Sequence, residues 1–358
     1  MAVTAAGQRD QQQARSEEMA LLKLAADGDE GAFRDLVEGH RGELRAHCYR
    51  MLGSLHDAED AVQDALLRAW RGLSGFEGRS SVRSWLYSIA TNTALDVSRH
   101  RSRRELPVSF GPAAKMGEFP AEPLMDAAWL EPYPDRWLTG DAAASPEARY
   151  EQRESVELAF IVALQDLPPR QRAVLILREV MGFSTAEISS QLGASAPAVN
   201  SALQRARAAA QGGLPAISQQ ATLRALGDQR TREIVQRYSD AIERGDADTL
   251  ISMLTKDATW SMPPTPVWYQ GHAALRDWLA REPLRERWRH QATRANGQLA
   301  VGCYLPDPAT GRFAAAVLDV LTMDGDRIAA VTAFLFHETP REPPADAFAR
   351  FGLPAELS

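Results

Sequence analysis

The sequence predicts a multidomain protein in which two all-α segments are followed by an α+β domain. Apolar residues recur at three- and four-residue spacing over residues 18–104 and again over residues 150–212, as they do in amphipathic helices. Over residues 229–340, helical spacing comes first and strand-like runs follow, which is the order typical of α+β domains. A proline-rich stretch over residues 105–149 separates the two helical segments.

Length and cysteine content limit the class of protein. A chain of 358 residues suits two or three domains. Cys48 and Cys303 are too few for a disulfide framework, and residues 1–17 have no apolar run that would make a signal peptide. No apolar run approaches the roughly 18 residues that span a membrane. We therefore expect a cytoplasmic protein with a disordered segment over residues 1–17 and no membrane partner.

The net charge of −7 argues against a general electrostatic attraction to nucleic acid. Any such contact would need a local basic patch, and the run RHRSRR over residues 99–104 supplies one. A solvated helix end explains the same run equally well.

The first helical segment, residues 18–104, contains three apolar stripes at helical spacing, which begin at Leu21, Ala61 and Val82. Carboxylates cluster where the second helix is expected to begin, and this placement suits the positive end of the helix dipole. They are Asp57, Glu59, Asp60 and Asp64. We expect Ser80 to cap the third helix.

Residues 105–149 have the composition of an extended, acidic linker. Seven acidic and two basic residues between positions 111 and 147 give this stretch a net charge of −5, and its prolines oppose regular structure. It nevertheless keeps four large aromatic residues that a pure spacer does not need, namely Phe119, Trp129, Tyr133 and Trp137. Part of the linker is therefore expected to dock on another surface.

The second helical segment, residues 150–212, predicts a helix-turn-helix. Such a motif needs apolar residues that fix two helices at a steep angle, and a glycine in the turn. Ile188, Leu192, Val199 and Leu203 supply the apolar set, with Ser189 as the small contact residue, Gly193 in the turn and Pro197 in the first turn of the second helix. Ser184 and Glu187 have the spacing of a capping box. An ordinary helical hairpin is the competing interpretation.

The exposed face of the second helix of this motif is expected to contact DNA. Asn and Gln can read adenine edges, and Arg can read guanine or hold phosphate. The predicted face carries Ser195, Ala198, Asn200, Ser201, Gln204, Arg205 and Arg207.

The third segment is divided into a linker over residues 213–228, an α+β domain over residues 229–340 and a C-terminal tail over residues 341–358. Two helices are expected around Gly245 and a short one over residues 272–280. Strands are expected over residues 298–305, 312–322 and 327–336.

These segments resemble a known family. Residues 49–64 (YRMLGSLHDAEDAVQD), residues 85–92 (WLYSIATN) and residues 167–207 resemble regions 2 and 4 of the extracytoplasmic function, or group 4, sigma-70 factors. The third segment resembles the SnoaL-like, NTF2-type cone appended to some of them. The matching pieces there are Tyr238, Gly245-Asp246, Asp257-Ala258, residues 262–264 (MPP), residues 268–271 (WYQG) and residues 351–354 (FGLP).

The resemblance implies a subunit that directs core RNA polymerase to promoters, recognises their −10 and −35 elements and promotes initiation. The implied partners are the β and β′ subunits of the polymerase and promoter DNA. The implied polymerase-binding residues are Met51, Leu52, Asp60, Gln63 and Asp64. The implied −10 residues are Arg83, Trp85, Asn92, Asp96, Arg99, Arg101 and Arg103, and helical spacing to Ile89 allows Trp85 to be a core tryptophan instead. The helix-turn-helix face would contact the −35 element.

The sequence departs from the family pattern in two places. Asn200 and Ala202 stand where many members have Lys or Arg, which predicts a weak or differently specific −35 contact. The linker is longer than usual. In the family this connector threads polymerase channels, and the acidic stretch over residues 126–141 is hypothesised to mimic nucleic acid there.

The C-terminal domain is expected to regulate the rest of the chain in cis rather than to catalyse a reaction. Trp260, Met262, Pro263, Pro264, Trp268 and Tyr269 are its expected regulatory residues. Asp319, His272, His290, His337 and Tyr269 could serve as acids or bases, but no spacing among them is diagnostic of catalysis. The sequence predicts no cofactor and no metal site, and it leaves an unidentified small-molecule ligand open. A helix-turn-helix regulator with a ligand-sensing or isomerase-like domain is the alternative.

Overall fold

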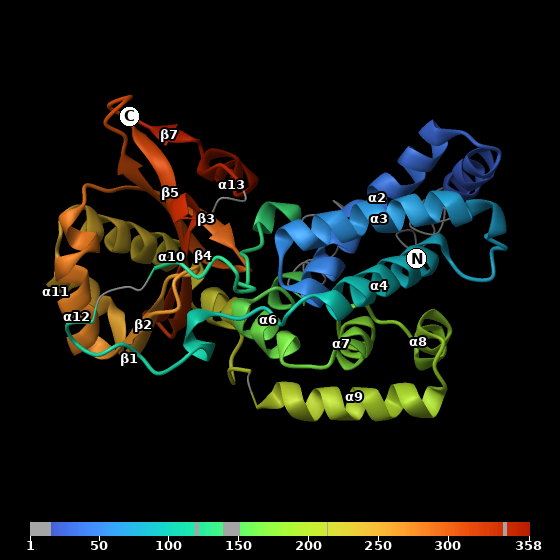
Figure 1. The fold of residues 1–358 in the computed structure, drawn as a ribbon, viewed down its shortest axis with the longest axis horizontal. Coiled ribbons are helices and arrows are strands. Elements are labelled where there is room, and N and C mark those ends of the chain that lie inside the picture. Colours follow the sequence, from blue (N-terminus) through green and yellow to red (C-terminus); the bar gives the residue numbers. More distant parts are fainter. Residues whose placement is uncertain (1–15, 119–121, 139–150, 213, 339–341) are drawn as a thin grey trace, which may run out of the picture.

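The computed structural model describes residues 16–118, 122–138, 151–212, 214–338 and 342–358. It has a helical lobe and a lobe built on one mixed sheet, and an extended segment joins them (Figure 1). None of the described helices is long and apolar enough to cross a membrane.

The first part of the helical lobe is a bundle of α2 (Glu30–Leu52), α3 (Leu55–Gly72) and α4 (Val82–His100), preceded by a helix over residues 16–26. Side-chain oxygens of Asp29, Ser54 and Ser81 cap the three helices of the bundle. The expectation that Ser80 caps α4 was wrong by one position, because it is Ser81 whose hydroxyl accepts from the Ser84 amide at 3.1 Å.

The second part of the helical lobe contains α6 (Leu158–Gln165), α7 (Pro169–Leu175), a π-helical turn (Ile176–Val180), α8 (Thr185–Leu192) and α9 (Ala196–Gln211). The predicted capping box is confirmed, since Ser184 and Glu187 bond reciprocally. Gly193 ends α8 with φ of 58°, a left-handed conformation that glycine adopts at little cost. These features give the helix-turn-helix geometry that the sequence predicts.

The C-terminal lobe has one sheet with strands in the order β2–β1–β6–β5–β4–β3, and β7 pairs with β5. The strands are β1 (Leu254–Ser261), β2 (Trp268–Gln270), β3 (Arg289–Ala295), β4 (Gln298–Pro306), β5 (Phe313–Asp324), β6 (Arg327–Leu335) and β7 (Glu356–Leu357). Of these, β1 and β6 run parallel, and the other pairs are antiparallel. Helices α10 (Gln219–Glu243), α11 (Ala247–Met253) and α12 (Gly271–Arg281) lie on one side of the sheet (Figure 1).

The three expected strands match β4, β5 and β6, whereas β1, β2, β3 and β7 were not expected from the sequence. The polar residues of β1 hid its alternation, and β3 is an edge strand with mostly exposed or half-buried side chains. Both β4 and β5 are nearly continuously buried, because each face of the sheet is covered.

The segments expected to flank the C-terminal domain are built into it. Helix α10 begins at Gln219, inside the expected linker over residues 213–228, and bends at Gly227. The expected tail forms α13 (Pro344–Arg350) and β7. Leu353 of this tail lies so close to Gly302 on β4 that a Cβ atom there would meet its Cδ1 at 2.5 Å. Gly302 thus allows the tail to pack on the outer face of the sheet.

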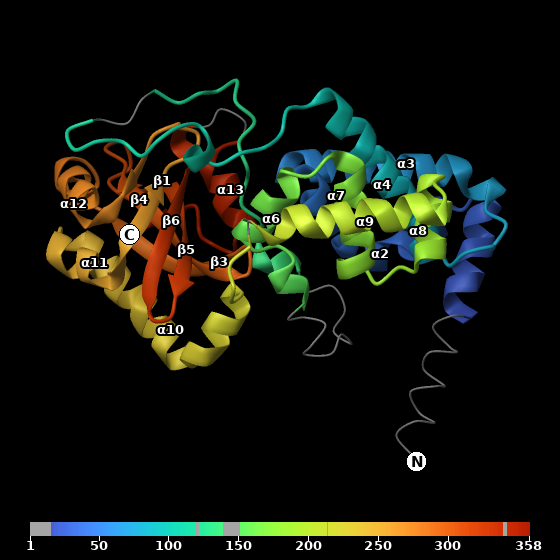
Figure 2. The same cartoon turned by 90° about the horizontal axis from the view of Figure 1, so that it is seen from below.

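The linker packs against both lobes, as its aromatic residues predicted. It runs along the C-terminal lobe and returns to the helical lobe (Figure 2). The amide of Ala114 donates to the Trp268 carbonyl at 2.8 Å, and that of Leu124 donates to the Pro264 carbonyl at 3.0 Å. Trp129 and Tyr133 are buried and Trp137 is half-buried, while Phe119 lies outside the described residues. The linker is therefore an extended strap held between the two lobes.

Candidate functional site

The predicted DNA-reading face lies on the outer side of the helical lobe. All seven of its side chains are exposed on α9, and this helix runs along the surface below α7 and α8 (Figures 1 and 2). Ser195 is the N-cap of α9, Arg205 donates to Ser201 at 2.7 Å, and Arg207 pairs with Glu179 at 2.5 Å. Val199, Leu203 and Ala206 occupy the opposite, buried face. The helix can therefore present this face to a duplex without unfolding.

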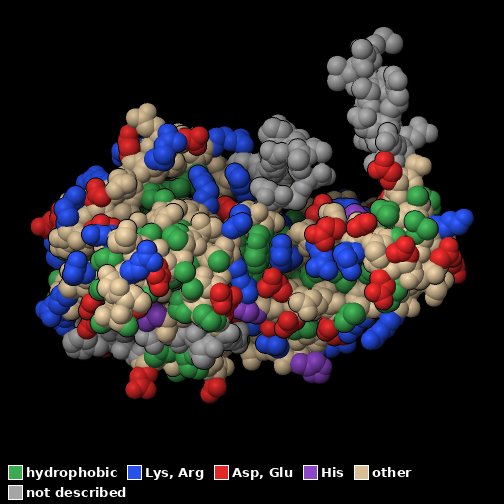
Figure 3. All heavy atoms as spheres, turned by 90° about the horizontal axis from the view of Figure 1, so that it is seen from above, with side chains coloured by type: hydrophobic (Ala, Val, Ile, Leu, Met, Phe, Trp, Pro, Cys, Tyr) green, Lys and Arg blue, Asp and Glu red, His purple; other side chains and the backbone are tan. Residues whose placement is uncertain are grey.

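The exposed face of α3 carries three of the five predicted polymerase-binding residues. Asp60, Gln63 and Asp64 are exposed, and the neighbouring Leu67, which is 54% exposed, adds an apolar side chain to this face. Acidic and basic side chains are interspersed over the face of the molecule in Figure 3.

Met51 and Leu52 do not belong to that surface. Their side chains are 0% and 6% exposed, at the end of α2 within the apolar core of the helical lobe. Both side chains pack in that core, and the Met51 carbonyl accepts from Arg172. In this structure the apolar pair beside the Gly53 turn contributes to the core, and its contact with the polymerase stays a prediction.

The predicted −10 residues lie on or just after α4, and several are engaged within the chain. Arg83 pairs with Glu43 at 3.0 Å and lies over the rings of Tyr87 and Phe183. Trp85 is half-buried against Phe76, with ring centroids 4.9 Å apart. Its position fits the core interpretation in this conformation.

The remaining −10 residues form ion pairs or polar contacts near the surface. Asp96 pairs with Arg68 and Arg99 at 3.1 and 3.0 Å. Arg101 pairs with Asp57 at 2.9 Å, and Arg103 with Asp166 at 2.5 Å. The side chains of Arg99, Arg101 and Arg103 are still about half exposed. They can therefore exchange their carboxylate partners for DNA phosphate.

Helix α8 of the helix-turn-helix packs directly on α4. The Asn92 amide and the Ser88 hydroxyl donate to the Gln191 carbonyl at 3.3 and 3.4 Å, and the Gln191 side chain donates to Ser84 at 3.0 Å. One face of the expected −10 helix is thus covered by the motif expected to read the −35 element.

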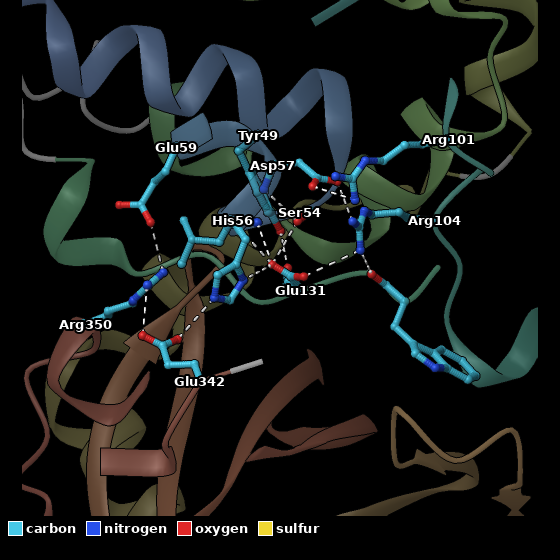
Figure 4. Close-up of polar contacts among 12 residues, drawn as sticks. Tyr49, Ser54, His56, Asp57, Glu59, Arg101, Arg104, Glu131, Glu342 and Arg350 are labelled. Carbon is cyan, nitrogen blue, oxygen red and sulfur yellow. Dashed lines mark hydrogen bonds and ion pairs between the residues drawn. The ribbon is translucent and has the colours of Figure 1, made fainter. Parts of the chain in front are cut away.

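A buried linker carboxylate, Glu131, joins the strap to the helical lobe (Figure 4). One of its oxygens accepts from the Ser54 hydroxyl and from the amides of Leu55 and His56 at 2.8–3.2 Å. The other lies 3.5 Å from Arg104, which also pairs with Asp57 at 2.5 Å. Burial raises the pKa of Glu131, but the hydrogen bond from His56 and the Arg104 charge outweigh it and hold the pKa at about 2. The linker thereby caps α3 with a charge that suits the helix dipole.

His56 connects this cluster to the C-terminal tail. Its Nδ1 lies 2.9 Å from Glu131 and its Nε2 lies 3.3 Å from Glu342. Glu342 also pairs with Arg350 of α13 at 2.9 Å, and Arg350 reaches Glu59 on α3 at 3.1 Å (Figure 4). The first turns of α3 are therefore bound by both the strap and the tail.

A second junction centres on Asn296 in the β3–β4 turn. Its side chain accepts from the Tyr133 amide and donates to the Tyr49 hydroxyl and the Val156 carbonyl, each at 2.8 Å. These partners belong to the strap and to both parts of the helical lobe. Reasoning from sequence missed Glu131, His56, Asn296 and Arg350, since no local pattern marks a partner so distant along the chain.

Three of the six predicted regulatory residues, Pro264, Trp268 and Tyr269, are hydrogen-bonded to the strap. Trp268 Nε1 donates to the Gly111 carbonyl at 2.9 Å, and the Tyr269 hydroxyl donates to the Glu118 carbonyl at 3.0 Å. Pro263 and Pro264 line a cavity of 140 Å³ between strap, tail and sheet. Trp260 and Met262 point into the cone instead and line its interior cavity.

The cone brings together two of the five acid–base candidates, Asp319 and His290. Asp319 accepts from the Tyr238 hydroxyl at 2.8 Å, and burial raises its pKa to about 6 although hydrogen bonds from Tyr238 and Cys303 oppose this. His272 instead contacts the Thr255 carbonyl at 2.8 Å, and His337 the Ala316 carbonyl at 3.2 Å. The cavity is thus a candidate binding site with one buried carboxyl group.

Comparison with protein families matches each of the three parts. Residues 36–104 match Sigma-70 region 2, residues 157–209 match Sigma-70 region 4, and residues 235–331 match the SnoaL-like domain. The crystal structure of the Mycobacterium tuberculosis extracytoplasmic function sigma factor SigJ shares the fold, with a TM-score of 0.51 and 23% identity over 84% of this chain and 97% of that one.

Curated relatives extend the match over nearly the whole chain. It is 42% identical to the ECF RNA polymerase sigma factor SigG of Mycobacterium tuberculosis, over 93% of this chain and 86% of SigG. It is 30% identical to ECF RNA polymerase sigma factor SigW of Bacillus subtilis, over 52% of this chain and 91% of SigW. A regulator that merely carried a helix-turn-helix would lack the region 2 match, and the chain belongs to the extracytoplasmic function sigma factors.

Proposed function

We propose that this sigma factor binds core RNA polymerase through the exposed face of α3, reads promoter DNA through α4 and α9, and is held in a closed state by its strap and C-terminal lobe. The observation that carries the regulatory part is the direct contact of Gln191 with Ser84, Ser88 and Asn92. Asp60, Gln63 and Asp64 supply the polymerase contact, and the arginines after α4 hold phosphate.

The closed state is too compact to engage both promoter elements. The names of the −10 and −35 elements give their base-pair positions relative to the transcription start, so the two elements lie about 25 base pairs apart. This is about 85 Å of duplex at 3.4 Å per base pair. Helix α9 has 16 residues and is therefore about 24 Å long. Because α8 contacts α4, the two reading surfaces are separated by only a few tens of ångströms. Promoter binding therefore requires α8 to leave α4.

The strap and the tail stabilise the closed state from the other side. Arg350 and Glu342 join the tail to α3 and His56, while Asn296 joins the sheet to both parts of the helical lobe. Weakening these contacts lowers the free energy needed to separate α8 from α4, and it shifts the population of the protein toward this open state.

Transcription in vitro with core polymerase tests this proposal. We expect the double variant Glu342→Ala/Arg350→Ala to start more transcripts than wild type at limiting sigma factor. The matched control is Arg312→Ala/Glu356→Ala, which removes an exposed ion pair within the C-terminal lobe and should behave as wild type. Equal or lower transcription by the Glu342/Arg350 variant, with unchanged polymerase binding, would refute regulation through these contacts.

A further inference from the structure

A cavity of 140 Å³ lies where the strap meets the other parts of the molecule, and we call it the inter-lobe cavity. Its wall includes Trp129 of the strap, Phe334 of the sheet, His56 of the helical lobe and Glu342 of the tail. It lies outside the cone, since Phe334 packs in the core shared with the helical lobe, and Leu335 lines both this cavity and the interior of the cone. The cavity therefore exists only where these parts come together.

The ionisable side chains in the wall already have partners within the chain (Figure 4). A charged ligand would lose its hydration there and would have to break one of these pairs to gain a counter-charge. The inter-lobe cavity thus favours an uncharged ligand. The pairs are Arg104 with Asp57 at 2.5 Å, His56 with Glu131 at 2.9 Å and Glu342 with Arg350 at 2.9 Å.

The rest of the described wall is apolar and largely rigid. Trp129 and Phe334 contribute aromatic rings, and Pro263 and Pro264 contribute rings whose backbone φ is fixed. The polar atom of the Trp129 indole is already in use, because it donates to the Leu124 carbonyl at 2.8 Å. A buried water molecule needs roughly two to four polar partners, whereas an apolar cavity stays dry and takes up apolar compounds. The wall therefore suits an apolar ligand better than water.

The volume of the inter-lobe cavity suits a single ring. An apolar cavity of about 150 Å³ in another protein holds benzene, and the 140 Å³ available here is close to that volume. Aromatic ligands gain from offset or edge-to-face contact with aromatic side chains such as Trp129 and Phe334. Met125 lines the cavity although it is 45% exposed, so its flexible side chain can move aside and admit the ligand.

We propose that the inter-lobe cavity binds a small uncharged aromatic compound of about one ring, and that this ligand stabilises the closed state. The ligand would touch the strap, the sheet, the helical lobe and the tail at once, and these contacts exist together only while the lobes are closed. A ligand that binds one state more tightly shifts the population toward that state. The regulatory part rests on the proposed function, whereas binding is measured without polymerase, so the two proposals can fail separately.

Calorimetric titration of the full-length protein with benzene tests the site. We expect one benzene to bind per chain, and we expect saturating benzene to raise the melting temperature because it binds the folded protein. Benzoate, which adds a charge to the same ring, should bind at least about tenfold more weakly. Equal binding of benzoate and benzene would overturn the assignment of an uncharged ligand.

Two matched variants locate the site. Ala127→Leu places a larger side chain in the cavity wall and should weaken benzene binding by about tenfold or more. Ala128→Leu makes the same change at a neighbouring, half-buried strap position outside the described lining, and it should bind benzene as wild type does. Both variants should keep a cooperative thermal transition, and Ala127→Val is the smaller change if Ala127→Leu does not. Absence of saturable benzene binding to folded wild-type protein, or equal binding by the folded Ala127 variant, would overturn the site.

Transcription in vitro tests the regulatory part. We expect saturating benzene to lower transcription by wild type at limiting sigma factor by about twofold or more and to leave Ala127→Leu unaffected. Asn296→Gly, which loosens the junction between the lobes, should bind benzene more weakly, since closing and binding favour each other. Benzene that binds wild type without lowering its transcription would overturn the regulatory part. Failure of Glu342→Ala/Arg350→Ala to raise transcription would count against the proposed function, whereas absence of benzene binding counts against this site alone.

Discussion

At the scale of single residues, charged and polar side chains decide which surfaces meet. Glu131 and Asn296 each satisfy several groups that the chain would otherwise bury without partners. Such networks are destabilising when one member is removed, because the remaining groups stay buried. His56 is the titratable link between the strap and the tail, and it makes the docking of both sensitive to pH.

The first prediction concerns this link. The hydrogen bond to Glu131 raises the pKa of His56 above 6.5, although burial opposes the shift. A raised pKa means that the protonated imidazole stabilises the folded state fully below pH 6.5, and that this contribution is lost as pH rises through the raised pKa. The difference in free energy of unfolding between wild type and His56→Gln should therefore shrink as pH rises above 6.5.

Denaturant unfolding between pH 5.5 and pH 8.5 measures this difference. The variant His100→Gln, at the exposed end of α4, controls for the loss of an imidazole. Its difference from wild type in free energy of unfolding should not shrink as pH rises above 6.5. A His56→Gln difference that is constant over this range, or that grows with pH, would contradict the role given to His56.

At the scale of elements, each functional helix is amphipathic and uses its two faces differently. The buried faces of α3 and α9 hold the helical lobe together through Ala61, Ala65, Val199 and Leu203. Their exposed faces are left for partners. Substitutions on the exposed faces should therefore change binding without changing stability.

For α3 we predict that Asp60→Ala/Asp64→Ala weakens binding to core polymerase by about 1–2 kcal/mol, since each exposed charge contributes up to about 1 kcal/mol. Co-purification or a titration with labelled core polymerase measures the loss. Asp35→Ala, an exposed carboxylate on α2, is the control. If the double variant binds as tightly as wild type with the same melting temperature, the polymerase-docking face lies elsewhere.

For α9 we predict that Gln204→Ala and Arg205→Ala each reduce initiation that depends on the −35 element by about 1–3 kcal/mol, the usual cost of losing a base contact. Arg207→Ala should act uniformly across promoter sequences if Arg207 holds phosphate after leaving Glu179. Transcription from promoters with altered −35 sequences distinguishes the two effects, with Arg237→Ala of α10 as control. Full activity of all three α9 variants would show that another surface contacts the promoter.

At the scale of the whole molecule, one apolar core crosses the boundary between the lobes. It includes Leu36 and Leu86 of the bundle, Ile188 of the helix-turn-helix, and Leu318 and Phe334 of the sheet. Deleting the C-terminal lobe would therefore expose this core as well as release the closed state. Point substitutions at the junction are the cleaner way to separate stability from regulation.

The prediction at this scale uses Asn296. Its φ of 55° is a left-handed conformation, so glycine is the replacement that removes the side chain at little backbone cost. Asn296→Gly removes three side-chain hydrogen bonds, one to the strap and two to the helical lobe, and avoids backbone strain. We expect it to lower stability by about 1–3 kcal/mol and to separate the single unfolding transition into two. Calorimetry checks this, and a single transition at the wild-type temperature would show that the junction does not couple the lobes.

The sequence by itself determined the order of the domains, the helix-turn-helix and three of the seven described strands of the cone, β4, β5 and β6. Helical and strand periodicities, caps and turn glycines act over a few residues, so they can be read locally. Helical spacing also predicted the exposed face of α9, and Asp60, Gln63 and Asp64 lie on the exposed face of α3. Their contacts with DNA and polymerase stay predictions. The burial of Met51 and Leu52 did not follow from the sequence, since apolar residues at a helix end can face either a partner or the core.

Only the tertiary structure decided how these parts meet. The path of the strap, the contact of α8 with α4 and the burial of Glu131 depend on partners tens to hundreds of residues away. Asp135, one of the seven acidic residues counted in the linker composition, is buried and accepts from the Gly297 amide at 2.7 Å. Composition gives the charge of a segment, but the desolvation and pairing of each charge depend on which distant surface the folded chain brings against it.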